Sequence, residues 1–328
     1  MKKVFIVNIL MILLILASIE AALRIFINIT PQGLSEGVID NTNIPVFNFP
    51  NVRGKKVFGK KVYTDNNGFR VEKKSEITKS ENLDKIYFVG GSVTFGGGVK
   101  QSDTFSGIIN KEKKNFKAIN ASVIGSNLKN NLAIIKEKIE YNDLKYVVVN
   151  FSLDDLIGLE EITNDNQFTS DKQNDLISKL KKNFILVSIN NFTRSKSVIY
   201  VMFKGAVLYA NKRYYQHALN TFKNEANIKY LKILMNLFSE KNKSLNKKIV
   251  FIMIPYNYQI RDENCSKKDL AEKIIEDNIL SKEMKLIKLK KVFCENKEKD
   301  KIFFKYDPSH LSSYGHKVVA EFLKKELD

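Results

Sequence analysis

Two short motifs at opposite ends of the chain carry the residue types of nucleophilic catalysis. The first is a Gly-Gly-Ser turn that ends in Ser92 and directly follows the apolar run 86–89. The second is Asp-Pro-Ser-His, from Asp307 to His310, directly before an amphipathic C-terminal stretch. A serine on a tight turn after a strand is accessible to substrate, and a histidine held by a nearby aspartate is a candidate base for it. The two motifs together predict a hydrolase triad.

Each motif also has a simpler interpretation. A glycine turn after a strand can cradle phosphate, but the phosphate loop requires Gly-x4-Gly-Lys-Ser/Thr, and Gly96 is followed by two more glycines and Val99. Gly-Gly-Ser can be a plain tight turn, and Asp307 can be a cap for the next helix. The joint occurrence of both motifs, in this order and at the two ends of one α/β pattern, favours catalysis.

Short apolar runs alternate with amphipathic segments along the chain. We expect a parallel sheet covered by helices on both faces. The expected strands are 85–89, 116–123, 146–151, 248–255 and 285–289, and the expected helices are 104–113, 128–141, 268–279 and 313–327. Ser92 would lie at the carboxyl edge of this sheet, where open α/β sheets bind ligands.

Four blocks of the sequence resemble the SGNH (GDSL-type) hydrolases, in particular membrane-anchored members among polysaccharide-modifying proteins. The two specific blocks are 88–99, followed by Asp-Thr-Phe at 103–105, and 307–316. The segment 120–125 is similar to the block whose glycine lends an N–H to the oxyanion, and 66–70 is similar to a segment that precedes the first strand in anchored members. The resemblance covers about residues 60 to 328. It implies a three-layer flavodoxin-like fold, Ser92 as nucleophile, and Asp307 and His310 as acid and base.

The expected oxyanion site consists of the N–H groups of Ser92 and Gly125 and the side chain at position 154. The family usually has an asparagine donor where this chain has Asp154. An ionised carboxylate cannot donate and would repel the developing negative charge. Asp154 would therefore have to be protonated or replaced by another donor, or else catalysis is weak or absent. Asn127 and Asn150 are possible substitutes without the expected spacing.

The N-terminus predicts an extracytoplasmic protein. Lys2 and Lys3 precede an apolar run from Val4 to Ile19 that spans a bilayer if the helix continues to Phe26. We expect an uncleaved signal anchor over 1–26, with the remainder outside the cytoplasm; a cleaved signal peptide is the alternative. A linker with small β elements is expected over 27–80, and the main domain over 81–328.

The amino-acid composition indicates which classes of partner the protein could bind. The 54 Lys and Arg against 36 Asp and Glu give a formal charge of +18, and 44% of residues are hydrophobic. Because the basic residues are spread lysines rather than an Arg-rich, aromatic-interleaved patch, we expect no nucleic acid partner but an anionic lipid or envelope polymer. Cys265 and Cys294 could pair across a loop of about thirty residues or remain thiols. The cysteine and histidine spacing supports no metal site, and we expect no cofactor.

Residues 157–245 form a long insertion, predicted to be helical over 216–240 and to act as a lid or subdomain. Its tyrosines could stack on sugar rings or simply pack: Tyr200, Tyr209, Tyr214 and Tyr215. His316 is expected to be structural.

The sequence therefore predicts an SGNH-type serine esterase acting on O-acetyl or other ester groups of a cell-envelope glycan or a small ester. An O-acyltransferase with the same residues, or a catalytically silent module that binds glycan or a partner, are the alternatives.

Overall fold

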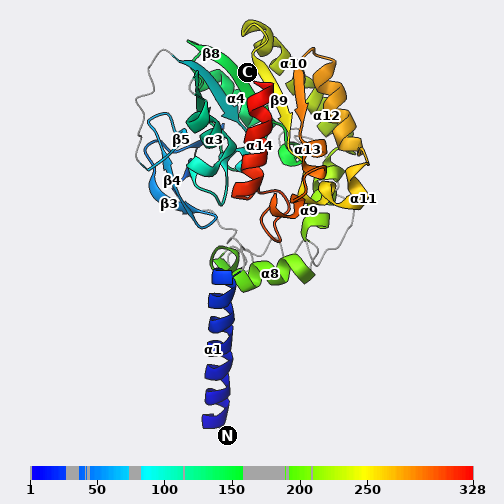
Figure 1. Cartoon of the computed structure of the whole chain (residues 1–328). Helices are drawn as coiled ribbons and strands as arrows, with labels where there is room; N and C mark the ends of the chain where they lie inside the picture. The colour runs from blue at the N-terminus through cyan, green and yellow to red at the C-terminus, as the bar shows by residue number, and fades with distance from the viewer. Residues whose placement is uncertain are drawn as a thin grey trace.

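The core of the protein is a doubly wound sheet (Figure 1). The computed structural model describes residues 2–26, 37–40, 42, 45–73, 83–113, 115–157, 189, 192–207 and 210–327. The parallel strands are β6 (Asp84–Val89), β7 (Phe116–Asn120), β8 (Leu144–Asn150), β9 (Ile249–Met253) and β10 (Lys285–Lys288). They lie in the order β7-β6-β8-β9-β10. This is the flavodoxin-like order, whose switch point lies between β6 and β8. The predicted fold class is confirmed.

An antiparallel extension widens the sheet beyond β7. It consists of β3 (Arg53–Val57), β4 (Lys60–Thr64) and β5 (Arg70–Val71), and β5 pairs with β7 through Arg70 and Asn120. A separate two-stranded ribbon is made by β1 (Ile39–Asp40) and β2 (Phe47–Asn48). The segment expected as a linker with small β elements thus contributes strands to the main sheet itself.

The central strands carry continuous apolar runs, such as 86–89 in β6 and 249–253 in β9, because both faces of the sheet are covered. In β6, Ile86 and Phe88 face one hydrophobic cluster, and Tyr87 and Val89 face the other, as the two-residue period of a strand requires. Helices α4 (Leu128–Glu137), α10 (Glu225–Ser244) and α12 (Leu270–Leu280) cover the second face. Helices α3 (Phe105–Glu112), α13 (Lys290–Cys294) and α14 (Ser313–Glu326) cover the first.

The helical stretch expected over 216–240 is divided between two helices. It spans the end of α9 (Ala210–Thr221) and most of α10, with residues 222–224 between them. Helix α10 buries Leu231, Leu234 and Phe238 in the core. It therefore belongs to the layer that covers the sheet, rather than to a part that stands over it.

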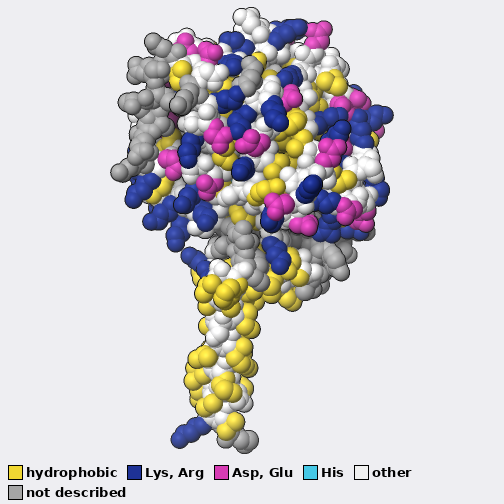
Figure 2. Space-filling model, viewed as in Figure 1, with side chains coloured by type: hydrophobic (Ala, Val, Ile, Leu, Met, Phe, Trp, Pro, Cys, Tyr) yellow, Lys and Arg dark blue, Asp and Glu magenta, His cyan; other side chains and the backbone are white. Residues whose placement is uncertain are grey.

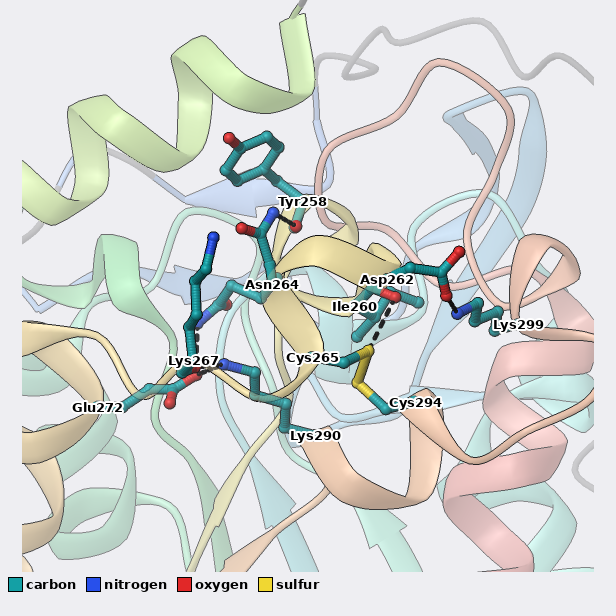
Figure 3. Close-up of a disulfide and its surroundings, with 11 residues drawn as sticks. Tyr258, Ile260, Asp262, Asn264, Cys265, Lys267, Glu272, Lys290, Cys294 and Lys299 are labelled. Carbon is teal, nitrogen blue, oxygen red and sulfur yellow. Dashed lines mark hydrogen bonds and ion pairs between the residues drawn. A yellow bond between two sulfur atoms is a disulfide. The ribbon is translucent and has the colours of Figure 1, made fainter.

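The two cysteines form a disulfide that joins α11 (Asp262–Cys265) to the end of α13 (Figure 3). Their Cα atoms lie 5.8 Å apart. An ion pair between Glu272 and Lys290, at 2.8 Å, adds a second connection beside this bridge (Figure 3). The question that the sequence left open is thus answered as a bridge between two short helices.

Helix α1 (Lys2–Phe26) extends away from the domain (Figure 1). Its hydrophobic side chains are exposed over most of its length, and Figure 2 shows them in contrast to the mixed charges of the domain. Residues 3–26 are long and apolar enough to cross a membrane, as a signal sequence also would be. The C-terminal end of α1 contacts α8 (Val198–Val207), which runs across it (Figure 1).

Candidate active site

The fold brings Ser92 and His310 into contact across 218 positions of sequence. Ser92 begins the short helix α2 (Ser92–Phe95), directly after β6, and His310 lies in the loop before α14. The His310 Nε2 atom lies 2.8 Å from Ser92 Oγ, and His310 Nδ1 lies 3.0 Å from both carboxylate oxygens of Asp307. The three side chains that the sequence singled out therefore form one hydrogen-bonded chain, at the carboxyl edge of the sheet.

Two glycines make the serine turn possible. A Cβ on Gly90 would lie 2.5 Å from Thr94 Oγ1 and 3.1 Å from Asn150 Cβ, so any larger residue would push α2 away from β8. Gly96 ends α2 in the left-handed region, with φ of 84°, where other residues are strained. The turn is thus fixed by close packing on one side of Ser92 and by backbone conformation on the other.

The Asp307 carboxylate is held from several directions. Its Oδ1 atom accepts the backbone N–H of Ser309 at 3.0 Å and that of His310 at 2.8 Å. Burial works to raise the pKa of Asp307, but the charge of His310 and these hydrogen bonds outweigh it and lower the pKa below its usual value. Asp307 is therefore an ionised acceptor, and the Nδ1 atom that faces it must carry the proton.

The environment of His310 favours its protonated form. Burial lowers its pKa, yet the charge and hydrogen bond of Asp307 and the more remote charge of Asp154 raise it above the usual value. Arg194 opposes this effect. The imidazole is only 15% exposed. When the N–H at Nδ1 donates a hydrogen bond to Asp307, the neutral ring presents the Nε2 lone pair to the Ser92 hydroxyl.

Arg70 holds the segment that follows the serine helix. Its guanidinium donates to the carbonyl oxygens of Phe95, Gly96 at 2.7 Å and Val99 at 2.6 Å, and it lies 4.7 Å from the centre of the Phe95 ring. Burial lowers the pKa of Arg70 to about 9. The resemblance had marked the segment 66–70 without giving it a role. Its arginine secures three carbonyls behind Ser92.

Phe58 is a site residue that the sequence did not indicate as such. It lies at the turn between β3 and β4, and its ring centre is 4.6 Å from that of His310. Its φ of 46° is unusual for a bulky residue, and the following Gly59 also has positive φ, as tight two-residue hairpin turns require. The local signal was Phe-Gly between two Lys- and Val-containing runs. That signal predicts a hairpin but cannot show what the turn covers.

Gly125 lies in the loop beside the serine turn. A Cβ on Gly91 would meet the carbonyl oxygen of Ser126 at 3.3 Å, which places residues 125 and 126 next to Ser92. Gly125 has φ of 77° and is exposed, with nothing near the position of a Cβ. Its surroundings therefore leave room for a ligand atom, and its conformation suits glycine.

Asp154 enters the site as an acceptor. It lies in the turn Leu153–Leu156 after β8, and its Oδ2 atom accepts the hydroxyl of Tyr214 from α9 at 2.8 Å. Burial, and then the charge of Asp154, raise the pKa of Tyr214 well above its usual value. The ring of Tyr256 packs 5.5 Å from that of Tyr214. The carboxylate is therefore arranged to receive hydrogen bonds, which is the opposite of what an oxyanion donor does.

Asn127, one of the two possible substitutes, and Tyr215 each make a hydrogen bond within the fold. The Asn127 side chain accepts the N–H of Asn130 and caps α4. The Tyr215 hydroxyl donates to Asp269 at 2.7 Å. Tyr200 lies half-buried in α8, and Tyr209 lies outside the described residues.

His316 is fully buried against Phe105, whose N–H donates to its Nδ1 atom, and burial lowers the pKa of this histidine to about 3. Among the residues that the structure describes, no three His, Cys, Asp or Glu side chains gather as metal ligands.

The structure of the chain was compared with known proteins and is similar to solved lipolytic proteins and esterases. No family model and no curated protein matches the chain. A lipase/acylhydrolase from Enterococcus faecalis matches at 12% identity and a TM-score of 0.42, over 75% of this chain and 95% of that one. A catalytic mutant of the acetylxylan esterase Axe2 from Geobacillus stearothermophilus matches at 13% identity and a TM-score of 0.41, over 76% and 96%.

A G-D-S-L family lipolytic protein from Veillonella parvula matches at 9% identity and a TM-score of 0.41, over 74% of this chain and 97% of that one. The chain is similar to these three proteins. At such identities and TM-scores the similarity does not assign a chemistry, so the case for function is carried by the geometry of the site.

Proposed function

We propose that this protein is a serine esterase of the SGNH type, tethered to a membrane and acting through Ser92, His310 and Asp307. The observation that carries the proposal is the 2.8 Å contact between His310 Nε2 and Ser92 Oγ, continued to Asp307 through Nδ1. This order of nucleophile, base and orienting carboxylate is the arrangement that activates serine in unrelated hydrolases.

The proposed reaction proceeds through an acyl-enzyme. His310 Nε2 takes the hydroxyl proton of Ser92 as Oγ attacks the ester carbonyl, and Asp307 stabilises the imidazolium that forms. Collapse of the tetrahedral intermediate breaks the ester C–O bond, and the same proton passes from His310 to the departing alcohol. Water then repeats the sequence on the acyl-Ser92 ester. It releases the carboxylic acid and restores the serine.

Two backbone N–H groups would donate hydrogen bonds to the oxyanion. The N–H of Ser92 opens α2, where first-turn N–H groups have no partner within the helix, and the N–H of Gly125 comes from the adjacent loop. Asp154, the third member expected from the sequence, accepts from Tyr214 and is not assigned as a donor. We infer an oxyanion site of two donors, at a cost in rate relative to a site with three.

The substrate we propose is an O-acetyl or similar short ester on a cell-envelope glycan. The proposal rests on the resemblance of 88–99 and 307–316 to polysaccharide-modifying members of the family, and on α1 as a tether. With Lys2 and Lys3 on the cytoplasmic side, the domain would lie on the extracytoplasmic side of the membrane. The second candidate function is a silent glycan-binding module, which the acceptor role of Asp154 favours.

Labelling with a fluorophosphonate probe separates the two candidates, because it reports whether Ser92 is activated. The full chain in detergent micelles should react with the probe and hydrolyse aryl acetates. Ser92→Ala and His310→Ala should abolish both signals with unchanged circular dichroism. Exposed Ser102→Ala and His217→Ala are matched controls that should keep both. Wild-type turnover in Ser92→Ala would exclude the triad, and a wild-type chain that never reacts would favour the silent module.

A further inference from the structure

Helix α8 is apolar on the side that faces the protein and on the side that faces away. Its inner side buries Val198 and Val201 against Leu23 of α1. Its outer side exposes Phe203, at 58%, and its one charged residue is Lys204. Phe192, just upstream, is 66% exposed. A surface helix in contact with water has a polar outer face. The outer face of α8 is therefore suited to an apolar surrounding.

The end of α1 holds α8 in a fixed position. The carboxylate of Glu20 accepts the N–H groups of Val198 at 2.8 Å and Ile199 at 2.9 Å, which are orphan donors at the start of α8. It also accepts the Ser197 hydroxyl at 3.1 Å. Arg24 pairs with Glu20 and donates to the carbonyl of Lys196. These contacts join the start of α8 to the last turns of α1, and α8 lies across the end of α1 (Figure 1).

The length of α1 places this junction at the depth of a membrane interface. Its 25 residues extend over about 37 Å at about 1.5 Å per residue, against about 30 Å for the hydrocarbon core. If α1 spans, its last turn and α8 lie among the headgroups. Hydrophobic side chains continue from α1 onto the adjoining base of the domain (Figure 2).

Exposed lysines line the β3–β4 hairpin, which lies on the lower side of the domain, toward α1 (Figure 1). They are Lys55, Lys56, Lys60 and Lys61. A cluster of this kind near a bilayer is attracted to anionic headgroups. The charge of this hairpin and the apolar outer face of α8 therefore suit the same surface.

We propose that the outer face of α8 lies in the interface of the bilayer that α1 spans, and that this contact holds the active site at the membrane surface. Tyr306 makes the connection: a Cβ on Gly205 of α8 would lie 2.4 Å from Tyr306 Cβ, and His310 follows four residues later. Phe58, which covers His310, belongs to the lysine hairpin. The site is thereby directed to esters carried at the membrane surface. The docking rests on α1 as an anchor, and its consequence for substrate rests on the proposed esterase.

The absence of tryptophan from the sequence allows single-tryptophan depth measurements. Three exposed positions are replaced one at a time: Leu13→Trp in α1, Phe203→Trp in α8, and Leu280→Trp at the amino edge of the sheet. Leu280 is 52% exposed, close to the value for Phe203, and serves as the matched control. Each full-length variant is reconstituted in liposomes with and without lipids brominated at known depths of the acyl chain.

We expect bromolipids to quench Leu13→Trp at mid-bilayer depth and Phe203→Trp at shallow depth, about 5–10 Å into the headgroup and acyl boundary, with Leu280→Trp unaffected. Quenching of Leu13→Trp alone would overturn the docking of α8 while keeping the anchor. Failure to quench Leu13→Trp would overturn both. A blue-shifted but unquenched Phe203→Trp would show that protein rather than lipid covers α8, and would also overturn the proposal. None of these readings depends on esterase activity.

Discussion

Replacing Asp154 with Asn should increase activity. The carboxylate accepts the Tyr214 hydroxyl at 2.8 Å, and its charge contributes to the raised pKa of His310. Asparagine has the same shape, and its amide oxygen can continue to accept from Tyr214. The amide NH₂ then occupies the position of the other carboxylate oxygen, where the resemblance to the SGNH hydrolases implies an oxyanion donor.

Two effects of Asp154→Asn can be separated by the pH profile. His310 acts as a base only when neutral, so its raised pKa sets the acid limb. Loss of the Asp154 charge lowers that pKa, because Asp307 is then the main anionic neighbour, and activity should persist to lower pH. The plateau should rise on the order of tenfold or more, since one oxyanion donor is typically worth about 10² to 10³ in kcat.

The assay is kcat and KM for an aryl acetate across pH, with Asp143→Asn as the control. Asp143 is an exposed aspartate at the amino edge of the sheet, and its replacement should change neither limb nor plateau. A shifted acid limb with an unchanged plateau would show that position 154 does not face the oxyanion. Loss of activity in a folded Asp154→Asn variant would refute the reasoning, because the carboxylate itself would then be required.

Three further expectations concern Arg70, the disulfide and the orientation of the domain relative to the membrane. Arg70→Met removes the guanidinium hydrogen bonds to the carbonyls of Gly96 and Val99 behind Ser92 and should lower the free energy of unfolding by roughly 3 kcal/mol or more, measured by denaturant titration. Replacing both Cys265 and Cys294 by Ser should cost about 3 to 4 kcal/mol, from the 29-residue separation of the bridge, with little change in kcat; equal stability with and without reductant in the wild type would contradict the bridge. Protease added to spheroplasts should leave only a small stub that contains Lys2, and full protection of the domain would contradict the proposed orientation.

The strands, the serine turn and the acid–base motif follow from local sequence. Runs such as 86–89 and 249–253 are apolar at every position, which indicates strands covered on both faces, and the structure has β6 and β9 there. The contacts within Gly-Gly-Ser and within Asp-x-x-His each involve residues that are only a few positions apart. The geometry of each motif is largely a property of its own backbone, and sequence reasoning could therefore single out Ser92, Asp307 and His310, which the structure brings into hydrogen-bond contact.

The contacts between distant segments were decided by the tertiary structure alone. The parallel pairing of β6 with β8 and of β8 with β9 sets where the loops after β6 and β9 lie. The N–H of Asn257, after β9, donates to the carbonyl of Pro308, and this contact helps to place His310 beside Ser92. The hairpin that carries Phe58 reaches the same place only because β5 pairs with β7.

The hydrogen-bond partner of Asp154 was also decided by the tertiary structure, because it is Tyr214 from the distant helix α9. The pairing of Cys265 with Cys294 depends on how α11 packs beside α13. Hydrophobic periodicity specifies which face of an element is buried, but not which distant side chain will face it, because that depends on the packing of all the layers together.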